Sequence, residues 1–332
     1  MIKSNYENKI TPHSTLRAPN SILAIVGPTC TFKSSIAIRL AEKYPFEIIS
    51  ADSRLVYKGM DIGTSKPTLE ERKSVPHHMI DLIEPNEEYT VAEYKRECEK
   101  KIQEIISRGK KPLLVGGTGL YLNSILLGLS IPEVKPDQSF RRQLREMSQD
   151  ELHGKLKKLD PKAAEKIHKN DNVRTVRALE VIYKTNKLFS ELKQSREIPY
   201  NVIWAGLTYE DRELHTQKIK ERTKNFLNNG FIDEVKNLLT KYGEIDLFKN
   251  TIGYKECIEY LNGKISETHM IERITLATRQ LAKRQMTWFK ANKKINWIYL
   301  DKTTDEEAYL AIEDLTLLEE RSFANTSIVS AS

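Results

Sequence analysis

The sequence lacks three features that would exclude a soluble intracellular protein. It contains no apolar run of about 18 residues, the length that a membrane-spanning helix requires. Its three cysteines, Cys30, Cys98 and Cys257, lie far apart and match neither a zinc-binding nor a disulfide spacing. The first 20 residues are polar and lack the apolar core of a secretory signal. We therefore expect a soluble protein of the reducing cytoplasm.

Charge is abundant and unevenly distributed. The chain has 332 residues, 39% hydrophobic and 30% charged, which suits one large or two modest globular domains. Its formal net charge is +7, and residues 134–198 hold 16 lysines and arginines against 10 acids, an excess of six. Such a concentrated basic surface favours a polyanionic partner, most commonly nucleic acid. An ordinary solvated helical face has the same composition, so charge alone does not decide.

Residues 27–34 almost match the phosphate-binding pattern G-x-x-x-x-G-K-[ST], with Phe32 where the second glycine is expected. An apolar run at 21–26 predicts a buried strand before this loop, and residues 34–43 have helical spacing up to Pro45. This order directs backbone N–H groups and a helix N-terminus at a phosphate. We expect Lys33 to reach terminal phosphate oxygens and Ser34 to hold Mg²⁺. The candidate phosphate-binding residues are Gly27, Pro28, Thr29, Cys30, Thr31, Phe32, Lys33 and Ser34.

The rest of the chain predicts a parallel α/β sheet with a helical insertion. Strands are expected at 22–26, 47–50, 112–115, 202–207 and 297–300, and helices at 91–108, 211–228, 232–241 and 270–290. Residues 132–198 are charged, poor in glycine and bounded by prolines, which indicates a helical insertion. We therefore expect a disordered arm at 1–20, a core at 21–131 and 199–320, the insertion at 132–198, and a loose tail at 321–332.

Polar or glycine-rich residues follow three of the predicted strands. They are the loop at Gly27, the segment Ala51-Asp52-Ser53, and the run Gly116-Gly117-Thr118-Gly119. Ligands of open parallel sheets bind beyond the carboxyl ends of the strands, so these segments predict one active-site cleft. Asp52 could hold a metal-bound water or act as a general base there. A turn cap would equally explain Asp52, and a tight turn would explain the glycines.

Longer motifs closely resemble the tRNA dimethylallyltransferases, also called tRNA isopentenyltransferases. The segment 51–67 (ADSRLVYKGMDIGTSKP) resembles the signature that follows the second strand of that family. Similar segments follow at 76–78 (PHH), 114–121 (LVGGTGLY), 171–180 (DNVRTVRALE), 253–254 (GY) and 278–288 (TRQLAKRQMTW). They run in the family's order from about Ser21 to Leu300 and are far more specific together than any single motif.

The resemblance implies a P-loop NTPase-like sheet and transfer of a dimethylallyl group from dimethylallyl diphosphate to the N6 amine of the adenine beside the anticodon of certain tRNAs. It also implies that the loop binds the prenyl diphosphate rather than a nucleotide, that Mg²⁺ is used, and that the insertion embraces the anticodon stem-loop. The target adenine must be swung out of its stack to react. A monomer is the family expectation.

The resemblance also assigns roles to individual residues. It implies that Asp52 is the base, that Thr118 contacts the substrate base or the diphosphate, and that Arg222 reaches the diphosphate. Arg222 could otherwise be a solvent-facing arginine, and Arg174 with Arg177, which share a helix face, could be surface salt-bridge residues. The tRNA contacts implied are Asp52, Ser53, Arg54, Leu55, Val173, Arg174, Thr175, Val176, Arg177, Asn250, Gly253, Tyr254, Lys255, Arg279, Lys283 and Arg284.

Two residues depart from the family pattern. Phe32 replaces the family's glycine, and Leu55 stands where many members have a glutamine that can bond the target base. A displaced catalytic loop loses on the order of 10²-fold in rate per 1 Å, so Phe32 leaves two states open. In one the ring points away and the enzyme is active, which we favour; in the other the chain is a weakened relative that still binds tRNA.

Three other functions compete. An adenylate isopentenyltransferase acting on free AMP, ADP or ATP would not need the basic insertion, which favours tRNA. A P-loop kinase of a small metabolite fits the first strand, loop and helix but not the later motifs. A non-catalytic RNA-binding protein would bind tRNA in a salt-dependent way without turnover.

Overall fold

The computed structural model describes residues 21–192 and 196–329, so the expected arm at 1–20 lies outside the described residues. Its centre is a six-stranded parallel sheet of order β3-β2-β4-β1-β5-β6. The strands are β1 (Ser21–Val26), β2 (Phe46–Ser50), β3 (His77–His78), β4 (Lys111–Gly116), β5 (Asn201–Thr208) and β6 (Asn296–Tyr299). The predicted α/β class is confirmed.

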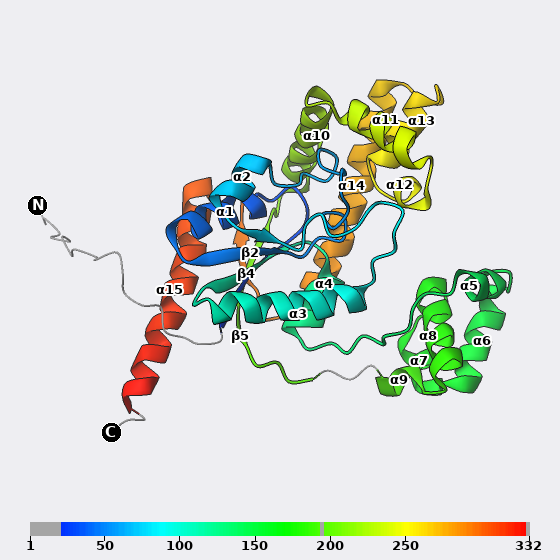
Figure 1. Ribbon diagram of the computed structural model, residues 1–332, viewed down its shortest axis with the longest axis horizontal. Coiled ribbons are helices and arrows are strands. Elements are labelled where there is room, and N and C mark those ends of the chain that lie inside the picture. Colours follow the sequence, from blue (N-terminus) through cyan, green and yellow to red (C-terminus); the bar gives the residue numbers. More distant parts are fainter. Residues whose placement is uncertain (1–20, 193–195, 330–332) are drawn as a thin grey trace, which may run out of the picture.

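Helices cover both faces of the sheet, which is why its strands are continuous apolar runs rather than alternating ones. Ile22 and Ala24 of β1 pack with residues of α3 (Val91–Ser107) and α4 (Gly119–Leu126). Leu23 and Ile25 face the other way and pack with α1 (Lys33–Lys43) and α15 (Asp305–Val329). Figure 1 shows α3 and α15 on opposite sides of the strands.

A second group of helices packs beyond the carboxyl edge of the sheet. It comprises α10 (Arg212–Asn228), α11 (Phe231–Tyr242), α12 (Asp246–Lys249), α13 (Tyr254–Leu261) and α14 (Glu267–Phe289). Its apolar core joins Phe231, Tyr254 and Met270 to Val56 and Met60 of the loop that follows β2. This loop, which also leads into α2 (Leu69–Ser74), therefore packs on these helices, and its backbone also bonds to residues 81–83 after β3.

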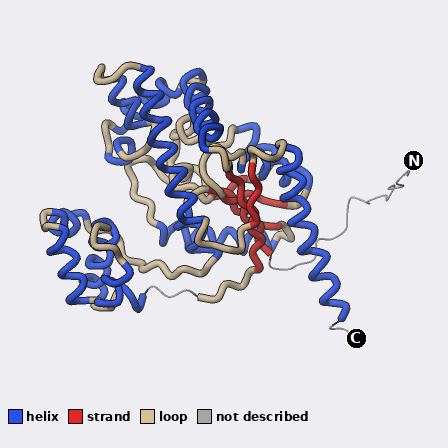
Figure 2. The backbone as a smooth tube through the Cα atoms, turned by 180° about the vertical axis from the view of Figure 1, so that it is seen from behind, coloured by secondary structure: helices blue, strands red, loops and turns tan. Residues whose placement is uncertain are grey.

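Residues 138–192 of the predicted insertion form a helical lobe beside the core (Figures 1 and 2). Its helices are α5 (Gln138–Arg145), α6 (Gln149–Leu159), α7 (Pro161–Lys166), α8 (Asn172–Thr185) and α9 (Phe189–Leu192). Leu144, Leu156 and Leu179 belong to an apolar core that these helices share among themselves. The lobe thus has its own packing, as expected for an insertion.

The expected loose tail is wrong for most of its length. α15 continues from Asp305 to Val329, and only 330–332 lie outside the described residues. The physical reason is that 305–329 contains no glycine or proline to end the helix, and its first half is seated on the sheet through Tyr309 and Ile312. Among the described helices, including this one, none is both long and apolar enough to cross a membrane.

Candidate active site

The sheet order brings the three polar strand ends together. β2, β4 and β1 are neighbours in the sheet, and their carboxyl ends lead to Asp52, Gly117 and Gly27. The N–H of Thr118 donates to the carbonyl of Ala51 at 3.1 Å, joining the second segment to the third. A Cβ on Gly117 would lie 3.4 Å from the carbonyl oxygen of Gly27, which joins the third to the first. The predicted cleft therefore has its three walls in contact.

The phosphate loop has the backbone expected of an anion-binding loop. Gly27 has φ 143°, and a Cβ there would lie 2.1 Å from the carbonyl oxygen of Leu207, so only glycine fits. Cys30 and Phe32 have φ 62° and 53°, in the left-handed region. No side chain caps the N-terminus of α1, so its first N–H groups remain for an anion.

Phe32 holds the conformation that glycine would adopt without cost. A left-handed L-residue costs about 1–2 kcal/mol, which the surrounding loop must offset. Phe32 is 42% exposed, so the ring is not packed into the interior beneath the loop. Phe32 is thus accommodated in the left-handed conformation with its ring directed away from the interior, which supports the active-enzyme interpretation.

Lys33 is folded back onto its own loop. Its Nζ donates to the carbonyl of Pro28 and, at 3.2 Å, to Oγ1 of Thr31. Burial lowers the pKa of Lys33 to about 8, and the positive charge of Arg222 acts in the same direction, against Cys30 and Asp52. The site thus contains a partly buried lysine whose hydrogen-bond partners are both neutral, and an incoming anion would stabilise its charged form.

Thr29 is held on three sides by residues of α10 and α14. Its N–H donates to Oε1 of Gln285 at 3.0 Å, and its carbonyl accepts from Nε2 of His215 at 2.9 Å. Its hydroxyl contacts Nη1 of Arg222, which also approaches Sγ of Cys30 at 3.3 Å. Burial, and then the charge of Lys33, lowers the pKa of His215, so the ring is a neutral donor to Thr29. Arg222 faces the loop and is not a solvent-facing arginine.

Asp52 and Thr118 lie together at the second and third strand ends. Oδ1 of Asp52 accepts from the N–H of Arg54 at 2.8 Å, and Oγ1 of Thr118 accepts from the N–H of Ser53 at 3.1 Å. Asp52 is half-buried, and within the described chain its Oδ2 has no hydrogen-bond partner. The turn-capping alternative thus accounts for one carboxylate oxygen, and the other remains free to accept a proton.

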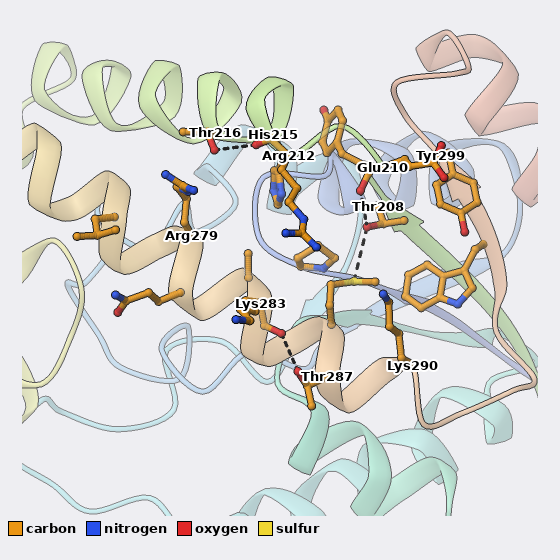
Figure 3. Close-up of a pocket in the computed structure, with 17 residues that line it drawn as sticks. Thr208, Glu210, Arg212, His215, Thr216, Arg279, Lys283, Thr287, Lys290 and Tyr299 are labelled. Carbon is orange, nitrogen blue, oxygen red and sulfur yellow. Dashed lines mark hydrogen bonds between the residues drawn. The ribbon is translucent and has the colours of Figure 1, made fainter.

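A cavity of about 690 Å³ lies between α10, α14 and the ends of β5 and β6, and Pro28 of the phosphate loop forms part of its wall. Figure 3 shows Arg212 of α10 and Arg279, Lys283 and Lys290 of α14 and its C-terminal cap around this cavity. None of these four cations forms an ion pair within the described residues. The surface next to the phosphate loop is therefore strongly positive.

The residues predicted to contact tRNA differ in how far they are exposed to solvent. Those exposed to solvent are Val173, Arg174, Asn250, Lys255, Arg279, Lys283 and Arg284, whereas Ser53, Arg54 and Leu55 are half-buried next to Asp52. Thr175, Val176 and Tyr254 are only 1%, 5% and 0% exposed, so their side chains offer little surface to a tRNA, and their assignment as contacts stays a prediction. Gly253 is also buried. These residues pack inside the lobe or the second helical group.

Arg177 is also committed within the lobe. Its Nη1 pairs with the buried carboxylate of Glu180 at 2.5 Å, and its Nη2 donates to the carbonyl of Val134 at 2.9 Å. Arg141 pairs with the same carboxylate at 2.8 Å, and the pKa of Glu180 is lowered by these partners against the opposing effect of burial. By contrast, Arg174 is exposed, and its ion pair with Asp171 is long, with 3.9 Å between Nε and Oδ2. Only Arg174 of the pair is free to contact a phosphate.

Sequence reasoning missed the residues that anchor the loop after Asp52. Glu234 accepts from the N–H groups of Asp61 and Ile62 at 2.9 and 2.6 Å, and from the hydroxyl of Tyr254 at 2.6 Å. The buried Lys66 pairs with Asp61 and Asp81, both at 2.5 Å. Asp61, Lys66 and Tyr254 stand within the quoted motifs, but their residue types gave no sign of an anchoring role.

The protein ligands available next to the phosphate loop fit a magnesium ion that substrate phosphates would also bind. Among the described residues no group of three or more histidines, cysteines or acids could hold a metal by itself. Ser34 stands in the first turn of α1 with an exposed side chain and no hydrogen-bond partner in the part of the chain described. Mg²⁺ usually keeps several waters and is bound by one or two protein oxygens with substrate phosphates, which suits Ser34.

Comparison with known proteins agrees with this geometry. The family described as IPP transferase matches residues 55–292. The chain is 44% identical over 296 residues to the tRNA dimethylallyltransferase of Caldanaerobacter subterraneus subsp. tengcongensis, covering 86% of this chain and 94% of that protein. It is 41% identical over 282 residues to the same-named protein of Synechococcus elongatus, with 85% and 91% covered.

Solved structures give the same result. The tRNA isopentenylpyrophosphate transferase of Bacillus halodurans superposes with a TM-score of 0.67 at 36% identity, covering 92% of this chain and 99% of that one. A eukaryotic dimethylallyltransferase acting on tRNA superposes with a TM-score of 0.73 at 29% identity, covering 89% and 79%. The predicted P-loop NTPase-like fold is confirmed by these neighbours.

The lowered pKa of Lys33 predicts that the protein takes up protons when it binds diphosphate. Near pH 8 about half of the Lys33 side chains are neutral in the empty loop, and a bound diphosphate favours the charged form. We expect inorganic diphosphate with Mg²⁺ to bind with uptake of protons near pH 8, and its affinity to fall as the pH rises further. Calorimetry in two buffers of different ionisation enthalpy measures the uptake. Lys33→Arg, which stays charged, is the control; equal uptake in both proteins would contradict the account.

Proposed function

The chain belongs to the IPP transferase family and is a prenyl transferase that modifies tRNA; we propose that it holds dimethylallyl diphosphate in the phosphate loop and transfers the prenyl group to the adenine N6 beside the anticodon. Diphosphate is the leaving group. The observation that carries the proposal is the contact between the loop at Gly27 and the segments bearing Asp52 and Thr118. One site can therefore hold a diphosphate and present a carboxylate to a nucleophile beside it.

The phosphate loop stabilises the charge that develops on the leaving group. The N–H groups at the start of α1 are uncapped, and the guanidinium of Arg222 faces the same loop. Lys33 exchanges its contact with the Pro28 carbonyl for a phosphate oxygen. Ser34 would hold a Mg²⁺ ion, which would supply further neutralisation of the diphosphate charge when bound. Fixed donors of this kind need little rearrangement as the carbon–oxygen bond breaks.

Asp52 accepts the proton of the attacking amine. An aromatic exocyclic amine is a weak nucleophile, and it becomes acidic as the bond to the prenyl carbon forms. The free Oδ2 of Asp52 is available for that proton, while the bond from the N–H of Arg54 orients the carboxylate. Thr118 lies beside Asp52 and contacts the adenine or the diphosphate. Leu55 packs in the same loop without the hydrogen-bonding capacity of a glutamine.

The tRNA lies against the basic surfaces of the lobe and of α14. Arg174 on the lobe and Arg279, Lys283 and Arg284 on α14 are exposed, and phosphate contacts of this kind position a nucleic acid without reading its sequence. The adenine leaves its stack to reach Asp52. We further propose that the protein acts as a monomer in the cytoplasm.

The competing functions are less well supported. The matched relatives are named for tRNA, and an enzyme for free AMP, ADP or ATP would have no use for the lobe at 132–198. A metabolite kinase does not account for the family match. The weakened-relative interpretation depends on Phe32, whose backbone adopts the left-handed conformation that a glycine would also adopt.

Replacement of Asp52 by Asn tests the base. The variant keeps the oxygen that accepts from Arg54, so the turn should persist, but it cannot take up the proton. With dimethylallyl diphosphate and an unmodified anticodon stem-loop, we expect the single-turnover rate to fall by about 10²-fold or more, with tRNA affinity retained. Asp233→Asn, at an exposed site on α11, is the matched control. Wild-type rates in Asp52→Asn would remove Asp52 from this role.

The two lobe arginines should behave differently. Arg174→Ala should weaken tRNA binding and reduce the slope of log affinity against log salt concentration by about 1, because one phosphate contact is lost. Arg177→Ala should instead lower the thermal stability of the lobe, because Glu180 loses a partner while remaining buried. Binding isotherms across salt concentrations and thermal unfolding separate these effects. Unchanged tRNA binding by Arg174→Ala at every salt concentration would leave Arg174 as an ordinary surface charge.

A further inference from the structure

Gln285 of α14 bridges the two loops that the reaction must align. Its Oε1 accepts from the N–H of Thr29 in the phosphate loop at 3.0 Å, and its Nε2 donates to the carbonyl of Gly117 at 3.1 Å. Thr29 follows β1, and Gly117 follows β4 and precedes Thr118. One side-chain amide therefore spans the diphosphate side and the acceptor side of the site.

The packing around Gln285 is matched to this bridge. A Cβ at Gly117 would lie 2.3 Å from Nε2 of Gln285, so position 117 has room for the amide only because it is glycine. One helical turn further along α14, Trp288 packs against Gly119, where an added Cβ would lie 3.0 Å from Cβ of Trp288. Two successive turns of α14 therefore pack against the loop after β4, at Gly117 and Gly119. Gln285 also links α14 to the phosphate loop through its bond with Thr29.

The chemistry of the amide suits this position. A glutamine side chain supplies a donor and an acceptor at its tip without charge, and here each bonds to a backbone group of the opposite kind. Glutamate would present a second acceptor to the carbonyl of Gly117. A shorter asparagine would reach one loop but not both. The bridge thus needs this side-chain length and this pair of polar atoms.

We infer that Gln285 is a positioning residue that fixes the separation between the bound prenyl diphosphate and the amine held at Asp52 and Thr118. The inference rests on the proposed function and deepens it. Nucleophilic attack requires the amine nitrogen and the prenyl carbon to be aligned, and a displacement of about 1 Å costs on the order of 10²-fold in rate. Gln285 contacts neither reacting group, so its effect should appear in the transfer step and not in the binding of either substrate alone.

The test compares Gln285→Met and Gln285→Asn with wild-type protein and with Gln217→Met. Gln217 is an exposed glutamine of α10 that has no hydrogen-bond partner among the described residues. Four quantities are measured for each protein: the thermal midpoint, the affinity for an anticodon stem-loop, the affinity for inorganic diphosphate with Mg²⁺, and the single-turnover transfer rate at saturating substrates. The Asn variant keeps the polar chemistry and guards against a folding failure of the Met variant.

We expect both Gln285 variants to fold and bind each ligand with near-wild-type affinity, while the transfer rate falls by about 10- to 100-fold. Gln217→Met should match wild type in all four measurements. Full transfer rates in the folded Gln285 variants, or losses that merely parallel a lower folded fraction, would overturn the positioning role and leave the proposed function intact. A wild-type protein that yields no prenylated product would overturn both.

Discussion

The site depends on how the backbone of Thr29 is held. An anion-binding loop must keep its N–H groups pointed outward, and its position relative to the acceptor side of the site depends on the parts of the fold that hold it. Here the three polar groups of Thr29 are engaged by Gln285, His215 and Arg222 from two helices that pack against each other. The strained left-handed conformation of Phe32 can persist because the loop around it is fixed in this way.

A second set of contacts fixes the acceptor side. The loop after β2 carries Asp52 at its start and is anchored further along by Glu234 and by the buried Lys66. Its apolar residues Val56 and Met60 pack into the core of the second helical group. The long family motif at 51–67 therefore contains one group suited to chemistry, while much of the remainder fixes the position of that group. The same division applies to the lobe, where Arg177 holds Glu180 and Arg174 faces solvent.

Much of the architecture was predictable because parallel strands bring their carboxyl ends to one edge. Apolar runs located most of the strands, and the residues after β1, β2 and β4 located the cleft. The orientation of motif residues was not predictable, since a motif gives identity and order without burial: Thr175, Val176 and Tyr254 turned out to be core residues. Gln285 and His215 escaped notice because their roles depend on backbone groups far away in the chain. The two-residue β3 and the short helices α2, α4, α12 and α13 carry too little periodicity to be recognised. α15 continues into residues 321–329, where a loose tail was expected, because its sequence contains no glycine or proline that would end a helix.

The most direct test of the account is a crystal structure of the protein with Mg²⁺ and an unreactive analogue of dimethylallyl diphosphate. The account predicts that the diphosphate lies against the backbone N–H groups at the start of α1, with Lys33 and Arg222 on its oxygens and the prenyl carbon directed toward Asp52. A structure in which the ring of Phe32 occupies the phosphate position, or in which the diphosphate binds away from this loop, would contradict it.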